Sequence, residues 1–341
     1  MNHEKKVLVT GGTGAMGVYL VPELLKLGYR VDVVSLDQVE SNQKALRYIQ
    51  TKDARNMDFM RNLLTTEKYD AWVDFLIYPT TAQFRERYEF YLQNVGHYIY
   101  LSSYRIYANE EHPVTENSPR LLDIPSDDPE YLSSEDYSLY KARGEDMLKA
   151  SNFKNWTAIR PAITYSKRRF QLVTLEANVV VARAMQRKKV VLPEQARKVQ
   201  ATMSWAGDVA KMISRLVLNE NAYREIYTVA TSEHHTWGEI ADYYKELIGL
   251  EAVWVDKEDY IDIIAGTGSR KGAEWQLCYD RLFDRIMDNR KILKATGMKQ
   301  EELTTLKEGL RRELNALPKG YEWPETDINE RMDAYLAARG Q

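Results

Sequence analysis

The sequence predicts an α/β protein with a doubly wound parallel sheet and a smaller, mostly helical lobe toward the C-terminus. Two observations support this fold class. Short apolar runs alternate with amphipathic segments of helical length through the first 165 residues, and closely spaced glycines join the first such pair. Alternating strands and helices of these lengths form βαβ units with right-handed crossovers. From residue 166 to 341 the alternation loosens, which predicts the separate lobe.

The expected elements of the first part follow in chain order. Strands are expected at Lys6–Thr10, Val31–Leu36, Leu46–Gln50, Ala71–Tyr78, His97–Ser102 and Trp156–Arg160. Helices are expected at Ala15–Leu27, Asp58–Thr65, Thr81–Leu92 and Ser134–Lys149. A long polar loop from Asn109 to Ser134 separates the fifth strand from the last of these helices, and loops of this length are often functional. The second part predicts helices at Thr174–Arg187, Trp205–Asn219, Trp237–Leu247 and Leu303–Leu314, with short strands near Val190 and Tyr227.

Composition narrows the classes of function. The net charge of −3 and the pI near 6.1 give no basic excess for nucleic-acid binding, so no nucleic-acid partner is expected. Cys278 is the single cysteine, which excludes an intrachain disulfide and a thiolate metal cluster. The paired His234 and His235 lack further ligands at metal-binding spacing, so no metal site is expected. No uninterrupted run of about 18 apolar residues occurs, which predicts a cytoplasmic protein without a membrane partner.

The glycine-rich turn Thr10–Gly17 (TGGTGAMG) predicts a dinucleotide site. Its glycines at 11, 14 and 17 would allow a tight turn, close approach to a pyrophosphate, and packing of helix on strand. The N-terminus of the following helix would offer free N–H groups to the phosphates. Residues 1–165 are therefore expected to form an NAD(P)-binding Rossmann domain, with a returning segment near 199–230, and 166–341 mainly a substrate lobe. The expected cofactor contacts in the turn are Gly11, Thr13, Gly14, Ala15, Met16 and Gly17.

Two acidic positions extend this prediction. Asp37 lies 20 residues after Gly17, where an acid would bind the adenosine ribose of NAD, although the second strand could instead end at Ser35. An acid there favours NAD and disfavours the 2′-phosphate of NADP, without excluding NADP. Asp53, with Ala54 beside it, follows the third strand and could accept a hydrogen bond from the adenine amino group.

A Tyr-x-x-x-Lys pattern indicates acid–base chemistry. It occurs at Tyr48/Lys52, in a weak strand, and at Tyr137/Lys141, on an expected helix where this spacing places both side chains on one face. Oxidising an alcohol requires a base for the hydroxyl proton, and a tyrosine serves near neutral pH only if cations lower its pKa from about 10. Ser103, at the carboxyl end of the fifth strand, would hold the same substrate oxygen. Ser103, Tyr137 and Lys141 are therefore the predicted catalytic residues.

These motifs together resemble the extended short-chain dehydrogenase/reductase family, which contains the NAD-dependent epimerases and dehydratases of nucleotide-linked sugars. The matching segments cover about two thirds of the chain and are Thr10–Gly17, Asp53–Arg55, Tyr100–Ala108, Tyr137–Leu148, Ala158–Tyr165 and Ser204–Ile213. The resemblance implies catalytic roles for Ser103, Tyr137 and Lys141. It also implies that Asp53, Tyr137 and Lys141 contact the cofactor, and that a homodimer forms through the helices beginning at Thr81 and Tyr137.

Departures from the family pattern concern the substrate. The fourth strand ends in Asp74-Phe75-Leu76-Ile77 rather than His-Leu-Ala-Ala, and Tyr104 and Arg105 replace the acidic pair of the dehydratases. This replacement argues against sugar 4,6-dehydration. Gln200 stands where related enzymes often place a phosphate-binding arginine. The candidate substrate contacts are Tyr104, Tyr165, Arg168, Arg169 and Gln200.

Three hypotheses follow. The first is an epimerase that retains NAD, oxidises one carbon of a nucleotide-linked sugar and returns hydride to the other face. The second is a reductase of a keto-sugar or another small carbonyl compound. The third belongs to another class: a cofactor-sensing or RNA-binding protein that kept the fold.

Overall fold

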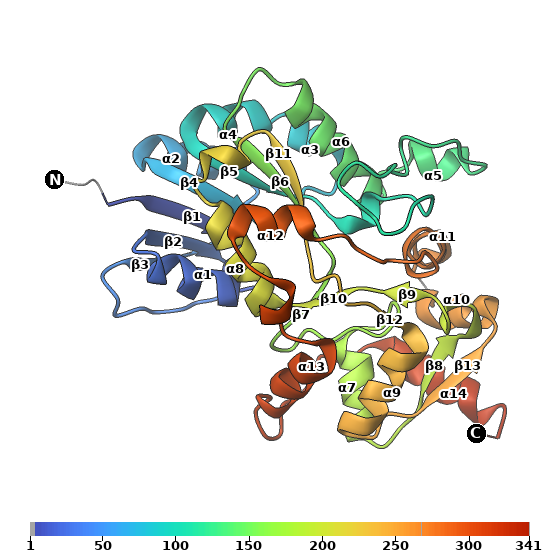
Figure 1. The fold of residues 1–341 in the computed structure, drawn as a ribbon. Coiled ribbons are helices and arrows are strands. Elements are labelled where there is room, and N and C mark those ends of the chain that lie inside the picture. Colours follow the sequence, from blue (N-terminus) through green and yellow to red (C-terminus); the bar gives the residue numbers. More distant parts are fainter. Residues whose placement is uncertain (1–3, 267, 341) are drawn as a thin grey trace.

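The central feature of the structure is a seven-stranded parallel sheet. The structure is a computed structural model and describes residues 4–266 and 268–340. The strand order is β11-β6-β5-β4-β1-β2-β3, and every pairing is parallel (Figure 1). The strands are β1 (Lys6–Thr10), β2 (Arg30–Ser35), β3 (Leu46–Gln50), β4 (Tyr69–Asp74), β5 (Val95–Leu101), β6 (Trp156–Pro161) and β11 (Glu225–Val229). The chain leaves β1 toward β2 and β3, then returns to the other side of β1, which confirms the doubly wound fold and creates a switch point between β1 and β4.

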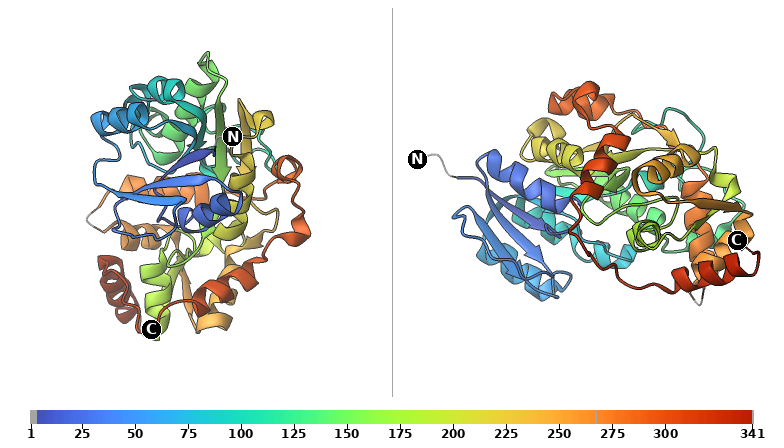
Figure 2. Two further views of the ribbon diagram at one scale, coloured as in Figure 1. Left: turned by 90° about the vertical axis from the view of Figure 1, so that its left-hand side faces the viewer. Right: turned by 90° about the horizontal axis from the view of Figure 1, so that it is seen from below.

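Helices cover both faces of the sheet (Figures 1 and 2). One face carries α1 (Gly17–Lys26), α8 (Ala206–Leu216) and α12 (Arg290–Thr296), and the other carries α2 (Met57–Thr66), α3 (Thr81–Arg85), α4 (Tyr88–Asn94) and α6 (Tyr137–Ala150). Within β1, Val7 and Val9 pack into the first layer and Leu8 into the second, as the alternation of side chains along a strand requires. The strands are thus apolar on both faces, as is usual for a parallel sheet.

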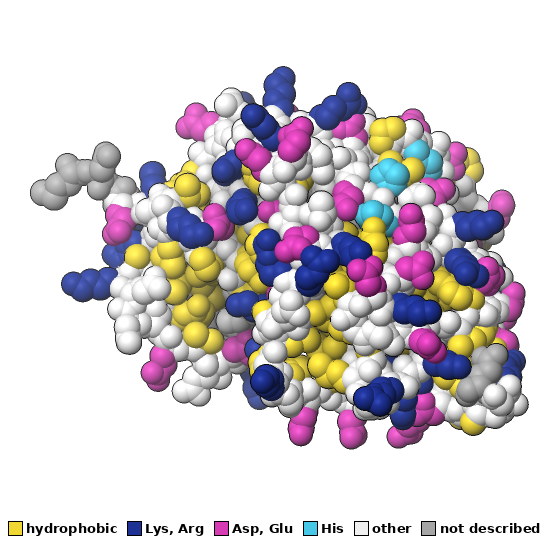
Figure 3. Space-filling model, turned by 60° about the horizontal axis from the view of Figure 1, so that its bottom comes forward, with side chains coloured by type: hydrophobic (Ala, Val, Ile, Leu, Met, Phe, Trp, Pro, Cys, Tyr) yellow, Lys and Arg dark blue, Asp and Glu magenta, His cyan; other side chains and the backbone are white. Residues whose placement is uncertain are grey.

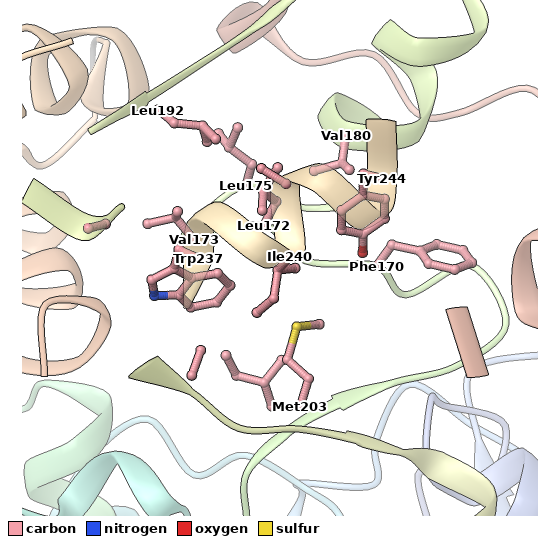
Figure 4. Packing of buried hydrophobic residues seen from close by; sticks show 14 of the residues in the cluster. Phe170, Leu172, Val173, Leu175, Val180, Leu192, Met203, Trp237, Ile240 and Tyr244 are labelled. Atoms are coloured by element: carbon pink, nitrogen blue, oxygen red, sulfur yellow. The ribbon is translucent and has the colours of Figure 1, made fainter. Parts of the chain in front are cut away.

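The lobe beside the carboxyl ends of the strands has its own core. Its strands pair as β7 (Ile163–Tyr165) with β10 (Met203–Trp205), β8 (Val190–Pro193) with β13 (Ala252–Val255), and β9 (Gln200–Ala201) with β12 (His235–Thr236). Its helices are α7 (Ala177–Met185), α9 (Trp237–Ile248), α10 (Lys257–Ala265), α11 (Arg270–Gln276), α13 (Leu306–Asn315) and α14 (Asp327–Ala337), while α5 (Pro129–Ser133) lies in the polar loop. Figure 4 shows Trp237 and Ile240 of α9 packed against Leu172, Val173 and Met203.

Several element boundaries differ from those expected. β4 begins at Tyr69 and ends at Asp74 rather than continuing to Tyr78, because the Asp74 carboxylate accepts hydrogen bonds from the Leu76 backbone N–H (3.0 Å) and the Tyr78 hydroxyl (2.9 Å) and turns the chain away from the sheet. The single helix expected at Thr81–Leu92 is two helices. α1 begins at Gly17 rather than Ala15.

The returning segment extends further along the chain than the sequence suggested. β11 pairs with β6 at the edge of the sheet and α8 packs against α1, as expected for residues near 199–230. α12 also packs on this layer, with Ile292 buried among residues of α1, α8 and the strands. The chain therefore crosses between sheet layer and lobe more often than a division at residue 165 implies.

None of the helices in residues 4–266 and 268–340 combines the length and apolar character needed to cross a bilayer. Within the same residues, no cluster of three or more His, Cys, Asp or Glu side chains is arranged to hold a metal ion.

Candidate active site

A cleft of about 770 Å³ lies across the carboxyl ends of the strands, between the sheet layer and the lobe. This is the edge at which open α/β sheets bind ligands. One end is lined by the glycine-rich turn and the ends of β2 and β3, the middle by Ser103 and Tyr137, and the far end by side chains of the lobe. The cleft is thus long enough to bring a dinucleotide and a second ligand together.

Backbone geometry builds the first end of the cleft. Gly11 has φ = +74°, and its N–H donates to the carbonyl of Val34 on β2. A Cβ on Gly17 would lie 2.5 Å from the backbone of Gly12, so only glycine permits this approach of helix to strand. The cleft lining at this end includes Gly11 and Gly17 together with Thr13, Gly14, Ala15 and Met16. These residues fit a dinucleotide, because the glycines let a ligand approach the backbone just before the N-terminus of α1.

The adenosine end differs in detail from the expectation. β2 ends at Ser35, whose hydroxyl lies 2.5 Å from that of Thr13 and accepts a hydrogen bond from the Asp37 N–H. Asp37 is exposed and lines the cleft two residues beyond the strand. Ala54 also lines the cleft, but Asp53 is exposed and is not among the lining residues. The structure therefore brings Asp37 and Ala54 to the cofactor end and leaves Asp53 outside it.

Of the three predicted catalytic residues, Ser103 and Tyr137 line the middle of the cleft and Lys141 lies buried beside Tyr137. Ser103 directly follows β5 and Ser102, and its Oγ caps a short 3₁₀ turn by accepting a hydrogen bond from the Arg105 N–H. Tyr137 is the first residue of α6 and is partly exposed, whereas Lys141, one turn later, is buried. The Lys141 Nζ lies 5.7 Å from the centre of the Tyr137 ring and donates a 2.5 Å hydrogen bond to the Leu101 carbonyl.

Burial and nearby charges act in opposite directions on the pKa of Tyr137, and the balance leaves it above the ordinary value. Burial raises the pKa of Tyr137, while the charges of Arg105 and Arg169 and a hydrogen bond with Ser103 oppose that rise. Burial lowers the pKa of Lys141 to about 8, so this amine is still mostly protonated at neutral pH. A phenol surrounded by cations, with a serine hydroxyl beside it, can exchange a proton with a substrate hydroxyl.

An ionic network behind α6, the helix that carries Tyr137 and Lys141, holds it in place. Glu145 lies two turns after Tyr137 on α6, is fully buried, and accepts two hydrogen bonds from the Arg160 guanidinium of β6 at 2.6 and 2.8 Å. The hydroxyl of Ser102, next to Ser103, donates to the same carboxylate at 2.5 Å. This network links α6 to two strands, and sequence patterns did not indicate it.

The predicted substrate residues are divided by the fold. Arg169 lines the cleft, and Tyr104 lines it from a buried position. Arg168 lies in a neighbouring pocket beside the glycine-rich turn. Tyr165 is buried in the lobe, within the described residues its hydroxyl has no hydrogen-bond partner, and it is absent from the cleft lining. Gln200 is also absent from that lining, and its side chain contacts His234 instead.

Sequence reasoning missed the group that closes the far end. Arg105 and Arg281 line the cleft and share the buried carboxylate of Asp280, whose Oδ2 lies 3.2 Å from the Arg105 Nε. The Tyr104 hydroxyl donates to the same carboxylate at 3.2 Å. Asp280 and Arg281 stand about 175 residues from Tyr104 and Arg105, so no local pattern could have joined them.

Comparison with known proteins agrees with this geometry. A model of the NAD-dependent epimerase/dehydratase family matches residues 7–230, about two thirds of the chain. The chain belongs to this family. This match confirms the resemblance inferred from the motifs. It also agrees with NAD as the expected cofactor, since the family is NAD-dependent.

Individual relatives are distant. The chain is 24% identical over 257 residues to "Chloroplast stem-loop binding protein of 41 kDa b, chloroplastic" of Arabidopsis thaliana, a match covering 70% of this chain and 62% of that protein's length. A dTDP-glucose 4,6-dehydratase of Bacillus anthracis in complex with NAD has a TM-score of 0.68 at 16% identity, covering 94% of this chain and 98% of that one. A UDP-glucose 4-epimerase of Thermotoga maritima with UDP-glucose has a TM-score of 0.66 at 18% identity, covering 91% and 97%. At these identities the structural matches show the shared fold.

Proposed function

We propose that the protein is an NAD-dependent epimerase of a nucleotide-linked sugar, working by transient oxidation of one carbon. The observation that carries this proposal is that Ser103 and Tyr137 line one cleft with the glycine-rich turn, with the buried Lys141 amine 5.7 Å from the centre of the Tyr137 ring. Membership of the epimerase/dehydratase family supports the reaction class. The Tyr104-Arg105 pair after Ser103, in place of two acids, favours epimerisation over the elimination of water.

The side chains divide the proton chemistry among them. Bound NAD supplies a reversible hydride acceptor at the carbon that is oxidised. The Tyr137 phenolate removes the proton of the substrate hydroxyl, and the resulting phenol returns it after the sugar has turned. Ser103 holds the same oxygen, and the Lys141 cation favours the phenolate form of Tyr137. The glycine-rich turn, with Asp37 and Ala54, holds the dinucleotide at the other end of the cleft.

A reductase would use the same residues once, so cofactor content distinguishes the two reactions. We expect freshly purified protein to release close to one equivalent of NAD on heat denaturation, as retention through turnover requires. Protein that is isolated empty and binds added NADPH would instead indicate a reductase. Protein that binds neither cofactor would contradict both.

Turnover is tested by incubating the NAD-containing protein with UDP- and dTDP-sugars and following epimer formation by NMR. We expect Tyr137→Phe to lower the rate by about 10²- to 10⁴-fold, because the acid–base group is lost. Tyr140→Phe is the matched control, since Tyr140 lies on the same helix, 5.5 Å from the Tyr137 ring, and should leave the rate within about twofold. Epimerisation that survives Tyr137→Phe unchanged would exclude the proposed mechanism.

A second candidate, binding of a nucleic-acid stem-loop, is favoured by the name of the Arabidopsis thaliana relative. The net charge of −3 disfavours it, and on the face in Figure 3 basic and acidic side chains are interspersed rather than separated. A gel-shift titration with stem-loop RNA at about 150 mM salt tests it. Binding at submicromolar concentration, unaffected by Tyr137→Phe, would favour this candidate.

A further inference from the structure

We propose that Arg105 binds a carboxylate on the sugar next to the reacting carbon, so that the substrate is a nucleotide-linked uronic acid. The inference rests on the proposed function and specifies its substrate class. Arg105 would then be a specificity-determining residue.

The position of Arg105 places its charge beside the reacting atoms. It follows Ser103 by two residues, lines the cleft, and its guanidinium carbon lies 5.2 Å from the centre of the Tyr137 ring. A substrate hydroxyl held by Ser103 and Tyr137 therefore has the Arg105 guanidinium within reach of its neighbouring substituents. Planar guanidinium groups bind carboxylates through two parallel hydrogen bonds.

The guanidinium of Arg105 also has donors to spare. Arg281 donates to the Val173 carbonyl at 2.7 Å, and Arg285 donates to the Tyr107 carbonyl at 3.0 Å, so both are anchored in the lobe and almost fully buried. The Arg105 side chain is 15% exposed. Among the described residues its Nε is buried beside Asp280 at 3.2 Å, its Nη2 lies 3.9 Å from Asp136, and neither Nη atom donates a hydrogen bond.

Four arginines, Arg105, Arg169, Arg281 and Arg285, surround this end of the cleft, against three carboxylates, those of Asp136, Glu176 and Asp280. Asp280 is shared by three guanidinium groups, those of Arg105, Arg281 and Arg285. Arg169 also faces Tyr137, and its charge acts on that phenol. Buried charge is costly unless it is paired, so this arrangement favours an anionic ligand in the cleft.

The anion could be a carboxylate of the sugar or a phosphate of the nucleotide. In a nucleotide-linked hexose the diphosphate is attached at C1, across the ring from C4. A uronic carboxylate is attached at C5, the direct neighbour of C4. When the C4 hydroxyl faces Tyr137, the group beside Arg105 is therefore the carboxylate.

The test measures affinities by calorimetry on NAD-loaded protein. UDP-glucuronic acid is compared with UDP-glucose, which carries a hydroxymethyl group in place of the carboxylate, and the corresponding dTDP pair is run in parallel. We expect the acid to bind at least about tenfold more tightly, as charge-assisted hydrogen bonds of about 1.4 kcal/mol or more would produce. Arg105→Gln should remove that preference and leave UDP-glucose binding within about twofold.

Control variants separate the role of Arg105 from its contribution to folding. Arg105→Lys keeps the charge without the paired donors and should retain part of the preference, and Arg85→Gln, an exposed arginine of α3, should retain all of it. Equal affinities in the unaltered protein, or equal weakening of both ligands by Arg105→Gln, would overturn the inference while sparing the proposed function. Failure of every nucleotide sugar to bind would instead remove the proposed function.

Discussion

The two ends of the cleft are built in different ways. The cofactor end is lined by six residues of one short turn, Gly11 and Thr13 to Gly17, and depends on backbone conformation and on glycines that allow close approach. The reacting end is formed by side chains that lie far apart in the chain, from Ser103 to Asp280, and depends on buried charges. The cofactor end should therefore be sensitive to substitutions that add atoms, and the reacting end to substitutions that remove a charge.

The largest effect is expected at the network behind the reacting end. Glu145→Gln should lower the free energy of unfolding by about 3–5 kcal/mol, because it leaves the Arg160 guanidinium buried without a counter-charge. Urea denaturation measures this change. Replacing both partners, Glu145→Met with Arg160→Met, should recover most of it.

Asp146→Asn is the matched control for this prediction. Asp146 is the next residue of α6, half-exposed, and pairs with Arg120 at 2.7 Å, so its loss should cost less than about 1 kcal/mol. Equal losses for Glu145→Gln and Asp146→Asn would mean that the buried network does not support the helix as described.

A smaller effect is expected from an added methyl group at the cofactor end. Gly17→Ala would place a Cβ 2.5 Å from the Gly12 backbone, and the turn must open to accommodate it. We expect NAD to bind about 10- to 100-fold more weakly, a loss of about 1.4–2.8 kcal/mol measurable by calorimetry. Gly28→Ala, at the other end of α1 with open space around it, should leave NAD affinity unchanged even though its φ of +83° makes alanine unfavourable there. NAD affinity that is unaltered by Gly17→Ala would contradict this description of the turn.

An effect of similar size is expected from the cost of burying Lys141. Because burial lowers the pKa of this amine to about 8, the protonated form opposes folding, and Lys141→Met should raise the free energy of unfolding by about 1–3 kcal/mol at pH 7.5. Between pH 8 and 10.5 the unfolded chain binds the proton more readily than the folded one, so the Lys141 contribution to stability rises with pH. The gain from Lys141→Met should therefore fall by more than half at pH 9.5.

Urea titrations of both proteins at the two pH values measure this difference, and the same variant should lose turnover. A gain that does not change with pH would show that packing, rather than charge, stabilises the variant. The reacting end would then resemble the cofactor end in depending on shape alone.

Much of the fold could be predicted from local patterns. Apolar periodicity predicted the limits of β1 and β3, and residue spacing predicted the glycine-rich turn and the presence of α6. Such signals reside within a few consecutive residues. The sequence context also favoured Tyr137/Lys141 over Tyr48/Lys52. The structure places Tyr48 on β3, where a spacing of four does not define a helical face. The early end of β4 was missed because the hydrogen bonds of Asp74 override the apolar character of the residues that follow.

The sequence by itself therefore determined the sheet, the dinucleotide turn and the Ser-Tyr-Lys grouping, since each is encoded by short-range periodicity or by residues at a shared sheet edge. The tertiary structure alone decided the far end of the cleft: it excluded Tyr165 and Gln200 from the lining and brought Asp280 and Arg281 to Arg105. It also returned α12 to the sheet layer. Contacts between residues so far apart depend on how the lobe packs against the sheet, and this packing leaves no periodic signal in the chain.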